Sequence, residues 1–370
     1  MYIPHVLGIF TENNFKIFQK MTPSKNTNGK VSKDIRDYKI VTLASHTALQ
    51  ILKGAKDEGF HTVAICPKGR RRPYESYGVA DEIIEIESYE EFYKIDKELS
   101  EENAIMIPHG SFIAYLGHDS VKEVKMMYYG TRDILEWESD REMERKWLLN
   151  SKLNLPKIYK NPEDIDGPVI IKFHGAGGGH GYFLANTPEE FYRRIKDHPD
   201  LKRGYVIQEY IVGVPIYAHY FYSRLTGELE VMGFDKRYES NADSIGRISA
   251  KDQLEVGVET SYTITGNIPI VLRESLLPQI FEMGDNVVAE SQKIAGEGLF
   301  GPFCLEMILD PNLKFNVFEI SARIVAGTNP YTNGSPYTWL RYDVPMSTGR
   351  RIALDIRQAI EVGELGKVLG

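Results

Sequence analysis

A lysine and a glycine-rich run follow an apolar segment in the middle of the chain. Val169-Ile170-Ile171 precede Lys172, and glycine then fills five of the seven positions from 175 to 181. Glycine lets backbone N–H groups turn toward a ligand, and lysine adds a positive charge, so both suit phosphate oxygens. The segment predicts a loop over the phosphates of a nucleotide. The alternative is a flexible hairpin tip beside a surface lysine.

Two other phosphate-binding loops do not fit this run. A P-loop needs Lys-Ser/Thr after its last glycine, and no such pair follows Gly181. A dinucleotide fingerprint that starts at Gly175 needs a third glycine where His180 stands. Because residues 182–185 are again strand-like, we expect a hairpin of strand, loop and strand.

Two glutamates interrupt apolar, strand-like segments near the C-terminus. Glu306 lies within residues 303–308 and Glu319 within residues 315–320, with a turn at 310–313 between them. A hairpin would place the two carboxylates side by side, where like charges repel. Mg²⁺ relieves that repulsion, since it takes one or two carboxylates and completes its shell with phosphates and water. The alternative is a buried ion pair with Arg323.

Serine and histidine follow two N-terminal strands at the point where each is expected to end. Ser45-His46 comes after residues 39–44, and His109-Gly110-Ser111 after residues 104–108. Ligands of parallel sheets bind at the carboxyl ends of the strands, and a helix start suits a phosphate. Each set alone is explained as turn or capping residues. Together they indicate a ligand pocket.

The elements that must position these residues fall into two patterns. In the N-terminal part strands and helices alternate, which predicts a parallel sheet with helical crossovers. From residue 169 onward strands follow one another with few helices, which predicts antiparallel sheets. The expected strands are 39–44, 61–66, 83–86, 104–108, 169–172, 182–185, 205–210, 216–222, 229–234, 303–308 and 315–320, and the expected helices 48–58, 89–99, 139–152, 188–196 and 273–295. Residues 239–267 are expected to be loosely structured.

Composition excludes several functional classes. The chain has 370 residues, 26% of them charged, and a formal net charge of −8, which argues against a nucleic-acid partner. No apolar stretch predicts a membrane span, and the first residues lack the pattern of a signal peptide. Cys66 and Cys304 both lie in apolar segments, where we expect core packing in a reducing compartment. We therefore expect a cytoplasmic, multidomain protein that binds no membrane.

Three of these segments resemble the ATP-grasp carboxylate–amine ligases. Residues 169–181 resemble the phosphate-covering hairpin, and residues 208–212 resemble the hinge whose glutamate and following backbone hold adenine. Glu306 and residues 318–323 resemble the metal-binding acids and the segment after them. Ser321 departs from the asparagine of many members, and Val214-Pro215 stands where a ribose-binding glutamate is expected.

A closer resemblance covers about residues 38–370. The strings 45–56, 108–115, 264–269 and 326–329 resemble the archaeal formate-dependent synthetases of 5-formaminoimidazole-4-carboxamide ribonucleotide (FAICAR). The resemblance implies that ATP, formate and 5-aminoimidazole-4-carboxamide ribonucleotide (AICAR) give FAICAR, ADP and phosphate through formyl phosphate, in purine (IMP) biosynthesis. Gly177 and His180 depart from loops that often carry basic residues there. The alternatives are another ATP-grasp ligase of a nucleotide amine and a non-catalytic nucleotide-binding paralogue.

The resemblance also assigns roles to residues. It implies an α/β (α+β) ATP-grasp fold with an N-terminal extension (1–36), a parallel-sheet substrate domain (37–130), a small lid subdomain (131–235) and a large subdomain with the metal site (236–370). Implied site residues are Lys172 and Arg323 for catalysis; Lys146, Lys172, Gly175, Gly177, Gly178, Gly179, Gly181, Glu209, Tyr210, Val212 and Glu239 for ATP; Ser45, His46, Ser111 and Asn267 for AICAR; and Glu306 and Glu319 for the metal. The implied cofactors are ATP and Mg²⁺, with Mn²⁺ as a substitute, and the implied partners are small molecules and further copies of the chain.

Overall fold

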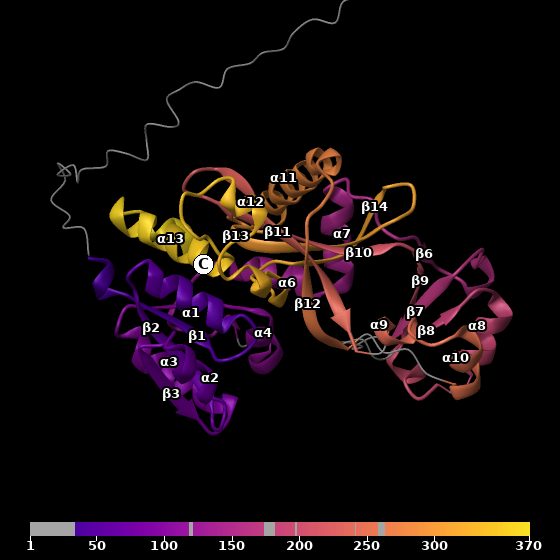
Figure 1. Ribbon diagram of the computed structural model, residues 1–370, viewed down its shortest axis with the longest axis horizontal. Coiled ribbons are helices and arrows are strands. Elements are labelled where there is room, and N and C mark those ends of the chain that lie inside the picture. Colours follow the sequence, from indigo (N-terminus) through magenta and orange to yellow (C-terminus); the bar gives the residue numbers. More distant parts are fainter. Residues whose placement is uncertain (1–33, 118–120, 174–181, 197, 241, 258–262) are drawn as a thin grey trace, which may run out of the picture.

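The computed structural model describes residues 34–117, 121–173, 182–196, 198–240, 242–257 and 263–370, which form three sheets (Figure 1). The N-terminal sheet is parallel, in the order β3-β2-β1-β4-β5. Its strands are β1 (Lys39–Leu43), β2 (His61–Pro67), β3 (Glu82–Ile86), β4 (Ala104–Met106) and β5 (Met127–Tyr128). The parallel sheet predicted from the alternating pattern is confirmed.

Helices cover both faces of this sheet, as crossover connections require. They are α1 (Ala48–Asp57), α2 (Arg72–Tyr77), α3 (Phe92–Ser100) and α4 (Gly110–Leu116). Helix α1 packs closely on α13 (Thr348–Glu361), because Gly54 and Gly349 leave each backbone free to approach the other. The C-terminal helix thereby fixes the N-terminal sheet against the rest of the chain, as the adjacent indigo and yellow ribbons show (Figure 1). Helix α13 is absent from the expected elements.

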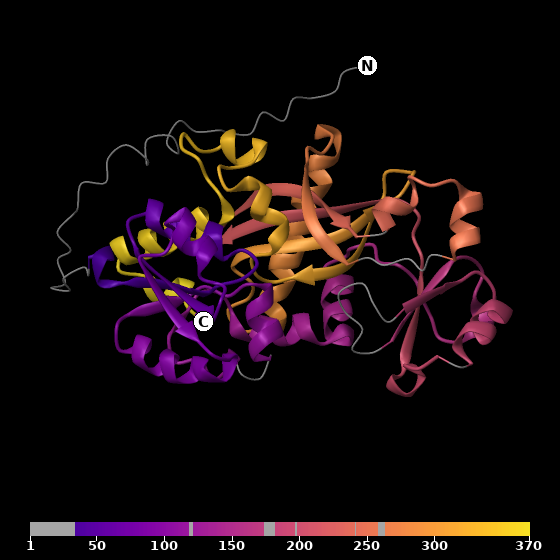
Figure 2. The ribbon, with the colours of Figure 1, turned by 60° about the horizontal axis from the view of Figure 1, so that its bottom comes forward.

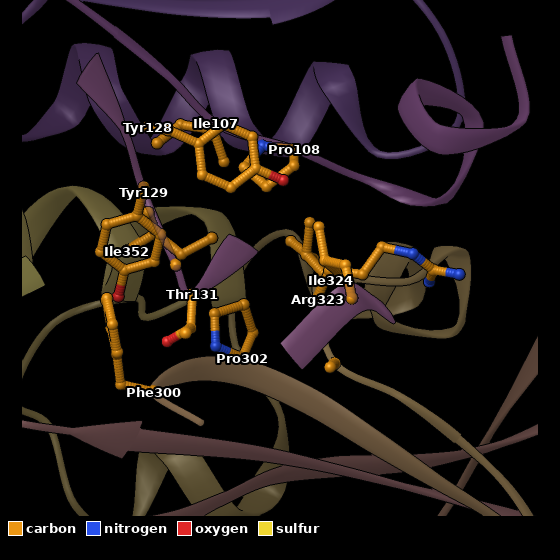
Figure 3. Close-up of a pocket in the computed structure, with 13 residues that line it drawn as sticks. Ile107, Pro108, Tyr128, Tyr129, Thr131, Phe300, Pro302, Arg323, Ile324 and Ile352 are labelled. Atoms are coloured by element: carbon orange, nitrogen blue, oxygen red, sulfur yellow. The ribbon is translucent and has the colours of Figure 1, made fainter. Parts of the chain in front are cut away.

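A small cavity lies between the N-terminal and central sheets (Figure 3). Apolar and aromatic residues such as Ile107, Tyr128, Phe300 and Ile352 line it. Its space for water centres is about 10 Å³, which is about one water molecule, so no nucleotide fits. Arg323 borders the cavity, but its guanidinium extends away from the tyrosine rings (Figure 3). This cavity is a packing defect of the interface and not the candidate site.

The second sheet, called here the lid sheet, is antiparallel in the order β6-β9-β7-β8. Its strands are β6 (Ile158–Tyr159), β7 (Val169–Phe173), β8 (Tyr182–Ala185) and β9 (Tyr205–Glu209), and α8 (Pro188–Ile195) packs on it through Phe191 and Ile195. Lys172 pairs with Tyr182 across β7 and β8, so the predicted hairpin around the glycine run is confirmed. The run itself lies outside the described residues.

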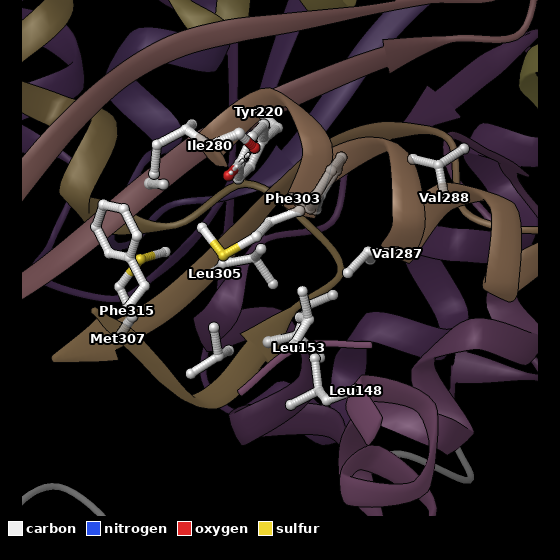
Figure 4. Close-up of a cluster of buried hydrophobic side chains, with 14 of the residues drawn as sticks. Leu148, Leu153, Tyr220, Ile280, Val287, Val288, Phe303, Leu305, Met307 and Phe315 are labelled. Atoms are coloured by element: carbon white, nitrogen blue, oxygen red, sulfur yellow. Dashed lines mark hydrogen bonds between the residues drawn. The ribbon is translucent and has the colours of Figure 1, made fainter. Parts of the chain in front are cut away.

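The central sheet is antiparallel in the order β12-β11-β10-β13-β14. Its strands are β10 (Val214–Ser223), β11 (Glu228–Glu239), β12 (Ile264–Ile270), β13 (Gly301–Leu309) and β14 (Phe315–Ser321). Ile216, Ala218 and Tyr220 alternate with residues of the opposite face and pack against α11 (Leu277–Ile294) in the main core (Figure 4). The opposite face of the same strands is therefore free to carry polar residues.

Other elements join the sheets. Helix α6 (Arg132–Ser139) precedes α7 (Arg141–Asn150), and the Asp140 carboxylate caps α7 by accepting from the N–H groups of Glu142 and Met143. One helix was expected here, so α6 corrects the prediction. Short helices are α9 (Ala242–Ile245), α10 (Ala250–Val256) and α12 (Pro336–Trp339), and 3₁₀ turns are Ile35–Asp37, Tyr89–Glu91, Pro162–Asp164, Leu201–Arg203, Glu274–Leu276, Ala326–Tyr331 and Leu365–Val368.

The three sheets form an elongated arrangement. The lid sheet lies at one end of the central sheet and the N-terminal sheet at the other, in both views (Figures 1 and 2). Within the described part of the chain, no helix is both long and apolar enough to cross a membrane.

Candidate active site

A row of four residues crosses the face of the central sheet opposite the main core. Asp235 on β11 opposes Tyr217 on β10, Tyr217 opposes Glu306 on β13, and Glu306 opposes Glu319 on β14. Directly opposed residues of an antiparallel sheet share one face and lie about 5 Å apart at Cβ. The predicted juxtaposition of Glu306 and Glu319 is therefore confirmed.

Arg237 holds one of these two acids. From β11 its guanidinium passes over the Tyr217 ring, 3.9 Å from the ring centre, and forms an ion pair with Oε1 of Glu306. The hydroxyl of Ser321 also donates to this oxygen, at 3.4 Å. The alternative partner named from the sequence, Arg323, is wrong, because Arg323 pairs with Glu138 of α6 at 2.8 Å. Local sequence patterns do not reveal the true partner, because Arg237 reaches Glu306 across the intervening strand β10.

The second carboxylate oxygen of Glu306 lacks a partner. Oε2 is buried and has no hydrogen bond within the described residues. An unpaired buried carboxylate oxygen is costly, and a cation at this position would satisfy it. No group of three potential His, Cys, Asp or Glu ligands exists among the described residues. The site thus fits an ion that takes two carboxylates here and its other ligands from elsewhere, as Mg²⁺ does with nucleotide phosphates.

Charges of the same sign crowd Glu319. The carboxylate of Glu306 beside it, and secondarily burial, raise the pKa of Glu319 to about 7. Because the Glu319 residue retains solvent access, we take the neighbouring charge as the main cause. Glu144 of α7 lies close by and accepts a hydrogen bond from the Ile320 N–H at 2.8 Å. Burial, followed by the Glu319 charge, raises the pKa of Glu144 to about 9. The cluster of Glu144, Glu306 and Glu319 therefore needs positive charge.

Lys172 supplies part of that charge from the lid sheet. Its Nζ lies 5.6 Å from the centre of the Phe318 ring on β14 and 3.3 Å from Oε1 of Gln208, to which it donates. Burial lowers the pKa of Lys172, whereas the Glu319 carboxylate opposes that shift. Arg141 at the start of α7 also acts on this lysine through its charge. Sequence reasoning missed Arg141, whose position depends on how α7 packs beside β14.

The predicted hinge residues have mixed surroundings. The Glu209 carboxylate accepts from the Lys157 N–H at 2.9 Å, and the Tyr210 N–H donates to the Pro168 carbonyl at 2.9 Å. Val212 is 67% exposed, and its N–H has no partner among the described residues, which leaves a donor for an adenine ring. Of these three residues, Val212 thus retains the free backbone group that base recognition needs.

The remaining residues assigned to ATP are Glu239, Lys146 and the glycines of the lid hairpin. Burial, and then the charges of Glu239 and Tyr210, raise the pKa of Tyr182 to about 12. Glu239 and Tyr210 therefore lie near the base of the lid hairpin. Lys146 is exposed on α7, and no hydrogen bond or ion pair of its side chain exists within the described segments. Gly175, Gly177, Gly178, Gly179 and Gly181 lie outside the described residues.

The Ser/His sets of the N-terminal sheet meet at the strand ends. Nδ1 of His46 lies 2.6 Å from the Ser111 hydroxyl, which also accepts from the Ser45 hydroxyl at 3.1 Å. The Tyr115 hydroxyl is 3.2 Å from that of Ser45. His46 has a positive φ of 45°, a strained conformation for a residue with a Cβ. The structure thus brings Ser45, His46 and Ser111 into one hydrogen-bonded group.

This group faces the acids of the central sheet. Burial, and then the positive charges of Arg323 and Arg237, lower the pKa of His46. Asn329 donates from its amide to the His46 carbonyl at 3.1 Å, which ties the segment after β14 to the strand end. Asn267 lies next to Arg237 in the register of β12 and β11. The residues predicted for the nucleotide pocket therefore lie near Arg237, which holds one of the residues predicted for the metal site.

Two family profiles match the chain, and neither carries a functional description. One, described as a domain of unknown function (DUF1297), covers residues 192–370, and the other, described as a protein of unknown function (DUF1246), covers residues 40–159. The two matches lie on either side of the lid hairpin.

Curated relatives match nearly the whole chain. A protein of Thermococcus kodakarensis is 56% identical over 90% of this chain and 99% of its own length. A protein of Methanocaldococcus jannaschii is 49% identical over 89% of this chain and 94% of its own length. Both are named 5-formaminoimidazole-4-carboxamide-1-(beta)-D-ribofuranosyl 5'-monophosphate synthetase.

Solved structures agree with these matches. The IMP biosynthesis protein PurP from Thermococcus kodakaraensis superposes with a TM-score of 0.73 at 30% identity, over 90% of this chain and all of that one. An ADP complex of N5-carboxyaminoimidazole ribonucleotide synthetase gives a TM-score of 0.61 at 13% identity, over 87% of this chain and 77% of that one. The second likeness shows the ATP-grasp fold alone, which confirms the predicted fold class.

Proposed function

Since the chain belongs to the family of FAICAR synthetases, we propose that the site described above carries out the formylation of AICAR. The protein is an ATP-grasp ligase of purine biosynthesis that converts AICAR to FAICAR with ATP and formate. The observation that carries the assignment of the site is the opposed pair of Glu306 and Glu319, with Lys172 above it and the His46–Ser111 group facing it. The pair, the lysine and the group come from three different sheets.

The protein uses ATP, and Mg²⁺ is the ion that we assign to the two glutamates. The unpaired Oε2 of Glu306 and the raised pKa of Glu319 both fit a bound cation. Glu306 and Glu319 would hold Mg²⁺, which would supply positive charge to stabilise the transferred phosphoryl group. Mn²⁺ prefers similar oxygen ligands and is the expected substitute.

The reaction needs two displacements. A formate oxygen attacks the γ-phosphorus of ATP, which gives formyl phosphate and ADP. The amine nitrogen of AICAR then attacks the formyl carbon, loses a proton, and releases phosphate with the former formate oxygen. Lys172 stabilises the charge on the phosphoryl group, and Arg323, which Glu138 holds at 2.8 Å, adds positive charge on the side of the acyl phosphate. These steps require positioning and charge more than covalent catalysis.

The N-terminal strand ends bind the AICAR nucleotide. Ser45, His46 and Ser111 offer polar side chains at the carboxyl ends of parallel strands, where a phosphate or ribose hydroxyl can be held. Asn267 approaches from the central sheet, on the side of the acids. The amine of AICAR would then face the metal-bound phosphates. Val212, with Glu239 near the lid hairpin, would hold ATP at the opposite end.

ADP release under defined mixtures tests this function. The purified protein with ATP and Mg²⁺ should release ADP at a substantial rate only when formate and AICAR are both present, and FAICAR should form in equal amount. ADP release with another carboxylate in place of formate would overturn the substrate assignment. The predicted domain boundaries and homo-oligomeric state stay predictions, and limited proteolysis and light scattering test them.

A further inference from the structure

A buried pair of side chains stands directly behind Asn267. Asp235 is 0% exposed and His219 is 1% exposed, and Nε2 of His219 lies 2.7 Å from Oδ1 of Asp235. The other carboxylate oxygen, Oδ2, accepts from the Asn267 side-chain amide at 2.8 Å. A histidine, an aspartate and an asparagine therefore form a continuous chain of hydrogen bonds that runs from the core to the site.

This chain fixes which end of the Asn267 amide faces the ligand. A carboxylate has only acceptors, so the atom of Asn267 that meets Asp235 must be the nitrogen. The oxygen, Oδ1, then points elsewhere, and it has no partner in the described part of the chain. Asn267 itself is only half-buried. The site therefore receives the Oδ1 acceptor of this residue, and the second N–H of its Nδ2 is the one donor that Asp235 leaves free.

The surroundings hold Asp235 in this role. A Cβ at Gly327 would collide with Oδ1 of Asp235 and Cε1 of His219, so the 3₁₀ turn Ala326–Tyr331 packs without a gap on the pair. Asp235 is fully buried and cannot rotate toward water, and its two oxygens already have partners. Neither residue is used by the phosphoryl-transfer machinery proposed above.

From these contacts we infer that Asp235, oriented by His219, is a positioning residue that makes Asn267 selective for an N–H group of the aminoimidazole-carboxamide head. An acceptor oxygen repels a phosphate, so Oδ1 of Asn267 faces the head of the nucleotide and not its 5′-phosphate. In the register Asn267 pairs with Arg237, which holds Glu306, so it lies at the metal end of the pocket where the amine must react. This inference rests on the proposed function, because it takes AICAR as the ligand.

The reciprocal exchange of the two residues tests the inference. In Asp235→Asn the new amide accepts from His219 and turns its nitrogen to Asn267, whose own nitrogen then faces the N–H of the substrate. The KM for AICAR should rise about 10- to 100-fold, as expected when a polar substrate group loses its partner, while the KM for ATP changes less than about 2-fold. The double variant Asp235→Asn with Asn267→Asp restores an acceptor, and its KM for AICAR should return to within about 3-fold of the wild-type value.

Controls separate this inference from the function itself. The exposed Asp343→Asn should match the wild type in the KM for AICAR, and thermal melting reports whether each variant folds. If the wild type releases no ADP with AICAR and formate, the proposed function fails. If the wild type is active but Asp235→Asn keeps its KM for AICAR, or the double variant is as impaired as the single one, the positioning role is wrong. Should Asp235→Asn alone fail to fold, recovery of both folding and the KM in the double variant supports the inference, and a folded double variant with a raised KM overturns it.

Discussion

Glu306 and Glu319 lie directly opposite each other on β13 and β14, but in the described part of the chain only Glu306 has an ion-pair partner. Arg237 neutralises Glu306, and among the described residues no cation lies within ion-pair distance of Glu319. The two acids of one metal site therefore contribute to stability with opposite signs, although both are needed for activity. This difference gives two predictions about stability that would not follow if both glutamates acted only as metal ligands.

Glu319→Gln should lower turnover and raise stability. The loss of a metal-binding carboxylate should reduce kcat at least about 100-fold. The variant also removes the repulsion from Glu306, so the free energy of unfolding should rise by about 1 kcal/mol, a value reduced for the solvent access of Glu319. Because the folded pKa is raised from 4.5 to about 7, this gain should be complete above pH 7 and absent below pH 4.5.

Urea unfolding at several pH values without metal measures this gain in stability. The exposed Glu282→Gln on α11 is the control, and a destabilised Glu319→Gln would contradict the prediction.

Glu306→Gln should lower both turnover and stability. It leaves the guanidinium of Arg237 without its ionic partner over the Tyr217 ring, at a position that is largely shielded from water. Breaking a fully buried pair from one side costs about 3–5 kcal/mol, most of it from the charge left behind, and the cost is smaller here because the Arg237 side chain is 23% exposed. The midpoint of urea unfolding should therefore move below that of the wild type, whereas that of Glu319→Gln moves above it. Equal midpoints for the two variants would refute the assignment of Arg237 to Glu306.

The adjacency of the two acids is predictable from the sequence because it depends on a local hairpin. Each strand is apolar on both sides of its glutamate, and the connecting turn is short. The partner of Glu306 is not predictable in the same way. Arg237 on β11 reaches Glu306 on β13 across β10. The order of these strands is set by tertiary packing and not by the local sequence pattern. The same reason explains the missed Arg141.

Strand β12 shows a second limit of sequence reasoning. The prediction of loose structure for residues 239–267 is wrong at its end, where β12 begins at Ile264, although proline donates no backbone hydrogen bond and glycine weakens strands. The strand is nevertheless formed, because β12 is at the edge of the sheet and a proline there leaves no essential bond unmade. Sequence patterns do not reveal the contact of Asn267 with Asp235, because it depends on the pairing of β11 with β12 and on a side-chain hydrogen bond between them.

His109 should make the protein sensitive to mild acid. Its ring is buried, Nε2 donates to the Leu43 carbonyl at 2.9 Å, and Nδ1 has no partner among the described residues. Burial, followed by the charges of His46 and Arg323, lowers its pKa from 6.5 to about 4. The neutral ring favours folding, so its stabilising effect is complete above pH 6.5 and is lost as the pH falls toward 4. Between pH 7 and pH 5 the wild type should lose about 2 kcal/mol more than His109→Gln, which keeps the donor but does not titrate. Parallel urea unfolding curves at the two pH values would contradict this.

Lys172→Gln should lower turnover without lowering stability. The lysine lies over Phe318 near Glu319, and burial lowers its pKa, so replacing the ammonium by a neutral amide removes a poorly solvated charge. Stability should not decrease, whereas kcat should fall about 100- to 1000-fold because the transferred phosphoryl group loses a fixed positive charge.

Lys172→Arg should not restore the rate, since a planar guanidinium cannot replace a point charge beside the Phe318 ring. Lys314 is an exposed lysine just before β14, and Lys314→Gln should match the wild-type rate in the same steady-state assay. A stable Lys172→Gln protein with the wild-type rate would remove the lid lysine from the mechanism.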